Sequence, residues 1–142
     1  QAASGLVTAQ DGQNTAYFTS LTSAISGREA RSSCVVINGQ NPLKVGAWLR
    51  TPVDPARTRA ALRVTFYADA ACSSVVNTWT QSASALSLSN QWELREYSLT
   101  AADVPDTAAF ATVSLRANYA SGIGASTDRV YFDGVTIDNS AP

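Results

Sequence analysis

The chain has no histidine and no methionine among its 142 residues, and its single lysine is Lys44. Without histidine it lacks the usual general base and the centre of serine and cysteine catalytic triads, so only carboxylates, tyrosine or lysine remain for acid–base chemistry. Glu93 and Glu96 lie three residues apart on one expected strand, which sends their side chains to opposite faces unless a bulge turns them. We therefore predict no catalytic residues and no enzyme activity.

An excess of charge of either sign is also missing. Ten Lys and Arg residues stand against eleven Asp and Glu residues, for a formal net charge of −1. A chain with so little net charge has no positive electrostatic potential that would attract it to phosphate backbones or to anionic lipid. No apolar run approaches the roughly 18 residues that a membrane helix needs. We expect no nucleic-acid partner and no membrane span.

The missing methionine bears on the cellular location as well. The opening Gln1-Ala2-Ala3 is typical of a chain from which a signal peptide has been removed, so we expect a secreted, extracellular protein. Two cysteines without histidine make a poor metal site but a good disulfide. Cys34 and Cys72 would close a loop of about 38 residues and stabilise the fold by about 4 kcal/mol. Two buried free thiols are the alternative.

What the sequence does contain is short runs of Val, Thr, Tyr and Phe, punctuated by eight glycines and five prolines. In one of them Leu62, Val64 and Phe66 alternate with polar residues and are expected to face inward. Turn signals separate nine such runs. They are Gly5–Ala9, Ala16–Ser23, Ser33–Ile37, Val45–Arg50, Ala61–Ala68, Val75–Ser82, Trp92–Leu99, Ala111–Asn118 and Arg129–Asp138. The pattern predicts one all-β domain over residues 1–142, an antiparallel β-sandwich (jelly roll) of eight or nine strands.

The last run (RVYFDGVTID) changes the parity of its apolar residues halfway along, which predicts a β-bulge at Asp133-Gly134. A similar parity change is expected between Leu94 and Tyr97. Asp133, with Asp128 or Asp138, could supply some of the six or more oxygens that a structural calcium ion needs. Alternatively, Asp133 accepts hydrogen bonds from local backbone amides. No other cofactor is expected.

A family resemblance rests on six segments in order, SSCVV, VGAWLRTP, ALRVTFYADAACS, QWELREYSL, ATVSLRANY and VYFDGVTI. Their succession from Ser32 to Ile137 resembles the galactose-binding-like jelly rolls that include many bacterial carbohydrate-binding modules. The resemblance implies the fold, while domains of this class serve as glycan binders, calcium-stabilised adhesion modules or structural domains. Such domains usually open with an NGDFE-type strand that pairs with the strand ending in FD, and this opening is missing here.

The missing opening predicts that the last strand lacks a neighbour in its own chain, and an unpaired apolar edge invites a strand from another chain. Residues 1–10 suit the role of donor, with Leu6 and Val7 as anchors, and Phe132, Val135 and Ile137 would line the acceptor. The favoured function is therefore a non-catalytic structural or adhesive subunit that joins other copies of itself into an extracellular filament. Pairing of the N-terminus within its own chain stays open.

The alternative function is a monomeric carbohydrate-binding module that recognises a polysaccharide by stacking sugar rings on exposed aromatic side chains. Trp79 lies between Thr78 and Thr80 in a polar strand and is the expected anchor. Its companions would be Tyr67, Tyr119 and Asn118. Trp48 and Trp92 lie in apolar strands and are assigned to the core.

Overall fold

The computed structural model of the chain describes residues 3–4, 16–19, 29–51, 58–81, 84–85, 91–119 and 129–138. These residues form eleven β-strands, eight of which have three or more residues, and one short 3-10 turn. They are β1 (Ala3–Ser4), β2 (Ala16–Thr19), β3 (Glu29–Arg31), β4 (Val35–Val36), β5 (Leu43–Arg50), β6 (Thr58–Tyr67), β7 (Val75–Thr80), β8 (Ser84–Ala85), β9 (Glu93–Leu99), η2 (Ala101–Asp103), β10 (Phe110–Tyr119) and β11 (Arg129–Asp138). In the described part of the chain, no helix is long and apolar enough to cross a membrane.

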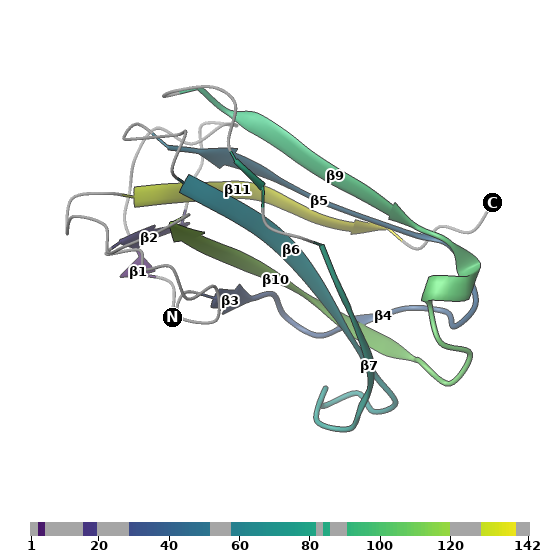
Figure 1. Cartoon of the computed structure of the whole chain (residues 1–142). Helices are drawn as coiled ribbons and strands as arrows, with labels where there is room; N and C mark the ends of the chain where they lie inside the picture. The colour runs from purple at the N-terminus through teal and green to yellow at the C-terminus, as the bar shows by residue number, and fades with distance from the viewer. Residues whose placement is uncertain are drawn as a thin grey trace.

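The strands build two sheets that pack face to face, as Figure 1 shows. The first sheet has the order β1-β2-β11-β5-β9. The second has the order β3-β10-β6-β7, with β4 also paired to β10 and β8 to β6. Neighbouring strands run antiparallel, for example β10 with β6 and β11 with β5. The predicted antiparallel β-sandwich is confirmed, and its strand number agrees with the eight longer strands.

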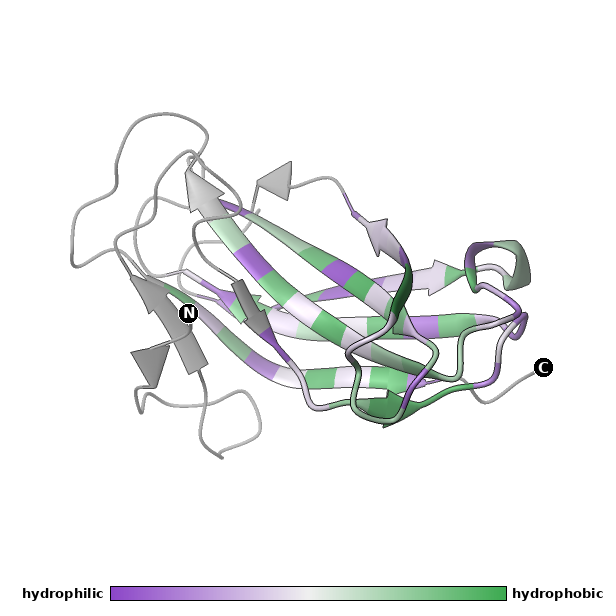
Figure 2. Cartoon of the chain, turned by 90° about the horizontal axis from the view of Figure 1, so that it is seen from below, coloured by the Kyte–Doolittle hydropathy of each residue, from purple (hydrophilic) through white to green (hydrophobic). Residues whose placement is uncertain are grey.

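The core lies between the sheets and follows from side-chain alternation along the longest strands. Leu62, Val64 and Phe66 of β6 are buried, as predicted, and so are Val113 and Leu115 of β10. Facing them from the first sheet are Leu43, Val45, Ala47, Leu49, Val130 and Phe132. Figure 2 shows the resulting alternation of hydrophobic and hydrophilic residues along the long strands. Each fully buried Val, Leu or Phe side chain stabilises the fold by about 1.5–3 kcal/mol.

The bulge predicted in the last strand is present. Asp133 pairs with Trp48 and the next pair is Thr136 with Gly46, so Gly134 and Val135 together oppose the single residue Ala47. Gly134 has a φ of 55°, in the left-handed region that glycine tolerates at low cost. Because one residue is absorbed there, Phe132 and Ile137 both contact the core although their spacing is odd.

The expectation that the last strand lacks a neighbour in its own chain is wrong. β2 pairs with residues 129–132 of β11, and β1 pairs with β2 in turn. The segment AYFT of β2 supplies the missing strand without the acidic residues that the family pattern led us to expect. The edge at which a foreign strand was expected to add is therefore occupied over this stretch of β11.

The predicted acceptor residues do not form an open groove either. Phe132 is only 2% exposed, and Ile137 packs against the core of its own chain. Val135 is 40% exposed, beside the bulge. The predicted donor residues Leu6 and Val7 lie outside the described residues.

A second correction concerns β9, where a parity change was predicted between Leu94 and Tyr97. β9 pairs with β5 without a register shift, from Leu43 opposite Leu99 to Leu49 opposite Glu93. The strand alternates regularly, so Tyr97 faces the inside and Leu94 the outside, where it is 45% exposed. The apolar pattern thus arises from a hydrophobic residue on the outer face and not from a bulge.

The predicted disulfide between Cys34 and Cys72 is confirmed, with the two Cα atoms 6.0 Å apart. It links the segment before β4 to the turn between β6 and β7. The Asp69 carboxylate holds this turn, because it accepts hydrogen bonds from the Ser73 hydroxyl at 2.6 Å and from the Ser74 amide at 2.7 Å. These bonds, the Ser73 hydroxyl foremost, lower the pKa of the Asp69 carboxyl below its ordinary value.

Removing the disulfide should lower the stability markedly. For a sequence separation of 38 residues, the loop-entropy relation gives about 4 kcal/mol. The double variant Cys34→Ser/Cys72→Ser should therefore unfold at a clearly lower urea concentration than the oxidised protein. Fully reduced wild-type protein is the control and should match the variant. An unchanged urea midpoint would contradict the stabilising role of this bond.

Acid should loosen the turn that Asp69 holds. The folded-state pKa of Asp69 is lowered, so its contribution is present above the ordinary aspartate pKa and is lost as the pH falls through the lowered value, below about pH 4. Asp69→Asn should lower the melting temperature at pH 7 and reduce its further fall in acid. Asp106→Asn, at an exposed residue outside this turn, serves as the control. Identical acid profiles for wild type and Asp69→Asn would refute the assignment.

Candidate functional site

The predicted glycan-binding residue Tyr67 is not available for stacking. It lies on the outer face of the second sheet, opposite Phe110, but is only 3% exposed. Arg31 Nη1 donates a hydrogen bond to its hydroxyl at 3.2 Å, and the Thr112 hydroxyl lies 3.4 Å from it. The prediction of an exposed ring at this position is therefore wrong, and the hydroxyl belongs to a largely buried polar network.

The prediction that Trp79 is an exposed anchor is also wrong. It stands opposite Val64, on the inner face of the second sheet, and is half-buried against the core. Its ring lies 5.9 Å from that of Tyr97, between centroids, at an angle of 53°. Because β7 and β9 end the orders of their two sheets, this ring pair spans from one sheet to the other.

The other two predicted residues lie far from Tyr67. Asn118 and Tyr119 stand opposite Arg59 and Thr58, at the other end of the ladder that β10 forms with β6. Eight residues separate this end from the pair of Phe110 with Tyr67, which is roughly 26 Å along an extended strand. The structure therefore does not bring the four predicted residues together.

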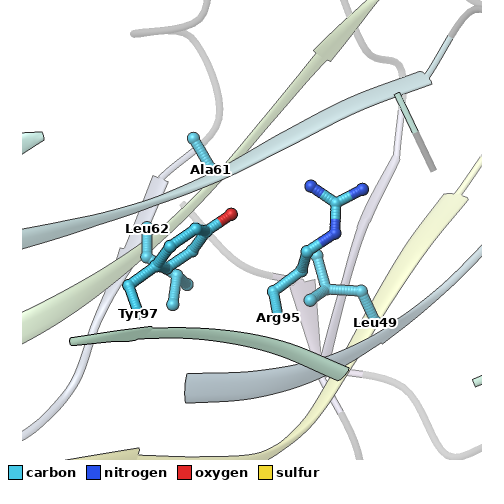
Figure 3. Close-up of a pocket in the computed structure, with 5 residues that line it drawn as sticks. All are labelled: Leu49, Ala61, Leu62, Arg95 and Tyr97. Atoms are coloured by element: carbon cyan, nitrogen blue, oxygen red, sulfur yellow. The ribbon is translucent and has the colours of Figure 1, made fainter. Parts of the chain in front are cut away.

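A narrow gap opens between the sheets beside the Trp79–Tyr97 pair (Figure 3). Tyr97 and Arg95 rise from β9 on either side of it, and Leu49, Ala61 and Leu62 complete its lining. The gap has no room for a water molecule. Arg95 Nε donates a hydrogen bond of 3.1 Å to Glu93, and both side chains are less than one-fifth exposed. We interpret the gap as a packing feature and not as a ligand pocket.

The exposed functional groups gather instead on the outer face of the first sheet, here called the Trp48 face. Three cross-strand rows from β11, β5 and β9 build it. The rows are Asp133–Trp48–Leu94, Thr136–Gly46–Glu96 and Asp138–Lys44–Ser98. In the middle row Gly46 contributes no side chain and is itself buried, with Thr136 Oγ1 3.2 Å from the place that a Cβ atom on Gly46 would take.

Trp48 was assigned to the core, and the structure corrects this. The inner positions of β5 are taken by Leu43, Val45, Ala47 and Leu49, so alternation turns Trp48 outward. Its half-buried ring lies against the bulge, since a Cβ atom built on Gly134 would be 3.0 Å from Trp48 Cδ1. Trp92 is also half-buried and precedes β9 with the parity of Leu94. The strict alternation of VGAWLR was the sequence signal that could have placed Trp48 outside.

Charged and polar side chains surround Trp48 and Leu94 on the Trp48 face. Lys44 Nζ lies 3.3 Å from Glu96 Oε1, and the two side chains are 53% and 43% exposed, so the pair contributes at most about 1 kcal/mol to stability. Glu96 thus lies on the opposite face of β9 from Glu93, as predicted. The Lys44 ammonium can donate hydrogen bonds and the Glu96 carboxylate can accept them, beside the apolar surface of Trp48 and Leu94.

Asp133 accepts a hydrogen bond of 2.7 Å from the Gly134 amide. This agrees with the alternative prediction for Asp133, that it bonds local backbone amides. Within the described residues, no three His, Cys, Asp or Glu side chains gather as a metal site. Asp128 lies outside those residues. A structural calcium ion at Asp133 stays a prediction.

A hollow of about 230 Å³ lies at the end of the Trp48 face. Lys44, Ser98 and Asp138 line it from the third cross-strand row, and Pro42, Leu43 and Leu99 complete it. The face therefore combines an apolar surface at Trp48 and Leu94 with polar side chains and a hollow at its end. This combination suits ring-shaped polar molecules with an apolar face, which is the chemistry of sugars.

Comparisons with known proteins support the fold. No family model and no curated protein matches the chain. Among solved structures, a family 16 carbohydrate-binding module is 16% identical with a TM-score of 0.58, over 96% of this chain and 84% of that one. The CBM22-1–GH10 modules of Clostridium thermocellum xylanase 10B, complexed with xylohexaose, are 16% identical with a TM-score of 0.64, over 99% of this chain and 24% of that one.

A third similar structure is not a carbohydrate-binding module. A chain of infectious bursal disease virus, Gt strain, is 11% identical with a TM-score of 0.61, over 88% of this chain and 29% of that one. This chain thus spans about a quarter of the xylanase chain and less than a third of the viral one. At such identities the comparisons establish the fold alone. The chain has the jelly-roll fold of carbohydrate-binding modules, which confirms the resemblance noted in the sequence.

Gly134→Ala should disturb both the bulge and Trp48. Alanine at a φ of 55° is strained, and its Cβ would press on the indole at 3.0 Å. We expect a loss of about 1–2 kcal/mol in urea unfolding and a shift of the intrinsic tryptophan fluorescence. Val135→Ala, at the exposed neighbouring position, should cost less than about 0.5 kcal/mol. Equal stability of the two variants would contradict this account of the bulge.

Proposed function

We propose that the chain is a non-catalytic, secreted carbohydrate-binding module that holds a polysaccharide on the Trp48 face. The observation that carries the proposal is the pair of Trp48 and Leu94. They are direct cross-strand neighbours on the outer face of a sheet, and Leu94 is 45% exposed in the free chain. An exposed apolar shelf flanked by hydrogen-bonding groups favours a ligand that has both kinds of surface.

A pyranose ring offers those two surfaces, since its C–H groups form an apolar face and its hydroxyls point outward from the edge. The ring would stack on the Trp48 indole and contact Leu94, while Glu96 and Thr136 bond its hydroxyls. Because Trp48 already rests on Gly134, little side-chain entropy would be lost on binding. The disulfide is consistent with an extracellular location, where such polysaccharides occur.

Assembly by strand donation, which the sequence favoured, stays an untested prediction with weaker support than the alternative. It required a vacant edge beside β11, and β2 pairs with that strand along residues 129–132. The carbohydrate-binding alternative needs no vacancy. It needs an aromatic side chain on an outer face, and alternation along β5 puts the half-buried Trp48 there in place of Trp79.

Affinity electrophoresis in gels containing xylan, xyloglucan, mixed-linkage β-glucan or galactan tests the proposal. Xylan comes first because one structure of similar fold was solved with xylohexaose. Wild-type protein should be retarded by at least one of these polysaccharides. Trp48→Ala should weaken that binding at least tenfold, the effect of losing about 1.4 kcal/mol, and Leu94→Ala by a smaller factor.

Two matched controls separate binding from folding. Trp79→Ala removes the same side chain between the sheets and should lower the melting temperature while leaving the affinity of the folded protein unchanged. Val75→Ala removes a 60% exposed aliphatic side chain from the second sheet and should leave both unchanged. Free migration of the wild type in all four gels would overturn the proposal, as would a loss of retardation in Trp79→Ala but not in Trp48→Ala.

A further inference from the structure

We propose that the outer edge of β7 pairs antiparallel with the same edge of a second copy of the chain, so that the second sheets of the two copies join into one. The inference starts from the place of β7 in the fold and does not depend on the proposed function. β7 is the last strand of the second sheet, and among the described strands it pairs only with β6. A strand in this place presents a row of backbone N–H and C=O groups that another strand can bond.

The ladder with β6 shows which backbone groups of β7 point to the outer edge. The Gln81 amide donates a hydrogen bond of 3.0 Å to the Leu62 carbonyl, so the backbone groups of Gln81 point toward β6. In an antiparallel ladder alternate residues point toward the partner strand and away from it, and Trp79 therefore also bonds β6. The N–H and C=O groups of Thr78 and Thr80 then point to the outer edge. Both threonines are exposed.

β7 lacks the features that normally keep a sheet edge from pairing with another chain. Its six residues, VVNTWT, include no charged residue and no proline. The edge strand β9 of the first sheet does carry such residues, namely Glu93, Arg95 and Glu96. A bulge is another protective feature, and in β7 it lies only at the start of the strand, where the register shifts between Phe66 and Tyr67 of β6. The rest of β7 pairs regularly.

The sequence of β7 is complementary to itself about Trp79. A two-fold axis at this residue places Thr78 of one copy opposite Thr80 of the other, and these are the residues whose backbone groups point outward. Each such pair exchanges two backbone hydrogen bonds, and paired threonine side chains favour strand pairing. Asn77 comes opposite Gln81, so that two amide side chains meet. Because this register brings no two charges together, a second copy is the partner that the strand fits.

The same axis brings the two Trp79 side chains next to each other. They form a non-hydrogen-bonded pair, in which side chains lie closer than in a hydrogen-bonded pair. Trp79 is half-buried in the single chain, with its ring centroid 5.9 Å from that of Tyr97. Pairing would join two such ring pairs into one aromatic cluster and bury more of each indole. The Trp48 face belongs to the first sheet, so the pairing does not use it.

Sedimentation equilibrium of the oxidised chain between about 1 µM and about 1 mM tests the inference. One strand pair is smaller than a standard interface of about 1,600 Å², so we expect a weak dimer. The average mass should rise from 14.9 kDa toward twice that value across this range. A mass that stays at the monomer value up to the highest concentration would overturn the inference.

Variants of Thr78 locate the contact. Thr78→Pro removes one outward N–H group while the ladder with β6 keeps its hydrogen bonds, since proline is tolerated where the N–H faces solvent. Thr78→Lys adds the charge that edge strands usually carry. Both variants should stay monomeric, whereas Thr78→Val keeps the backbone N–H and should dimerise like the wild type. Urea unfolding shows that each variant is folded. If Thr78→Pro and Thr78→Lys dimerise as well as the wild type, the copies meet at another surface and the inference is wrong.

Discussion

The bulge at Asp133-Gly134 is the constraint on which the rest of the structure depends. β11 lies between β2 and β5, so its side chains must stay in phase with the core along the whole strand. One absorbed residue lets Phe132 and Ile137 both reach that core. The same residue, Gly134, leaves room on the outer face for the Trp48 ring, which a Cβ atom would approach at 3.0 Å. The fold and the proposed binding shelf therefore share one local feature.

Those parts of the fold that rest on local patterns could be predicted from the sequence. Alternation placed Leu62, Val64 and Phe66 inside, the parity change located the bulge, and the cysteine count indicated the disulfide. The neighbour of the last strand could not be predicted in this way, because pairing is non-local. β2 has only four residues, AYFT, and nothing in them specifies β11 as their partner.

The candidate site was harder to predict, because residue type was weighed above alternation. Trp48 lies in an apolar run, yet its parity turns it outward. Trp79 has polar neighbours, yet it stands opposite Val64 and packs inside. Tyr67 faces outward as alternation requires but is covered and hydrogen-bonded, which no sequence pattern reports. Burial on the outer face of a sheet depends on segments distant in the chain.

The central claim is that a polysaccharide binds the outer face of the first sheet, at Trp48. The chain has three tryptophans, so an amide correlation spectrum should hold three indole N–H signals. The most direct measurement is a titration of ¹⁵N-labelled protein with xylohexaose, with the indole signals assigned by single substitutions. The account predicts that the Trp48 signal shifts with saturation while the Trp79 signal stays in place. A shift of the Trp79 signal with an unmoved Trp48 signal would contradict it.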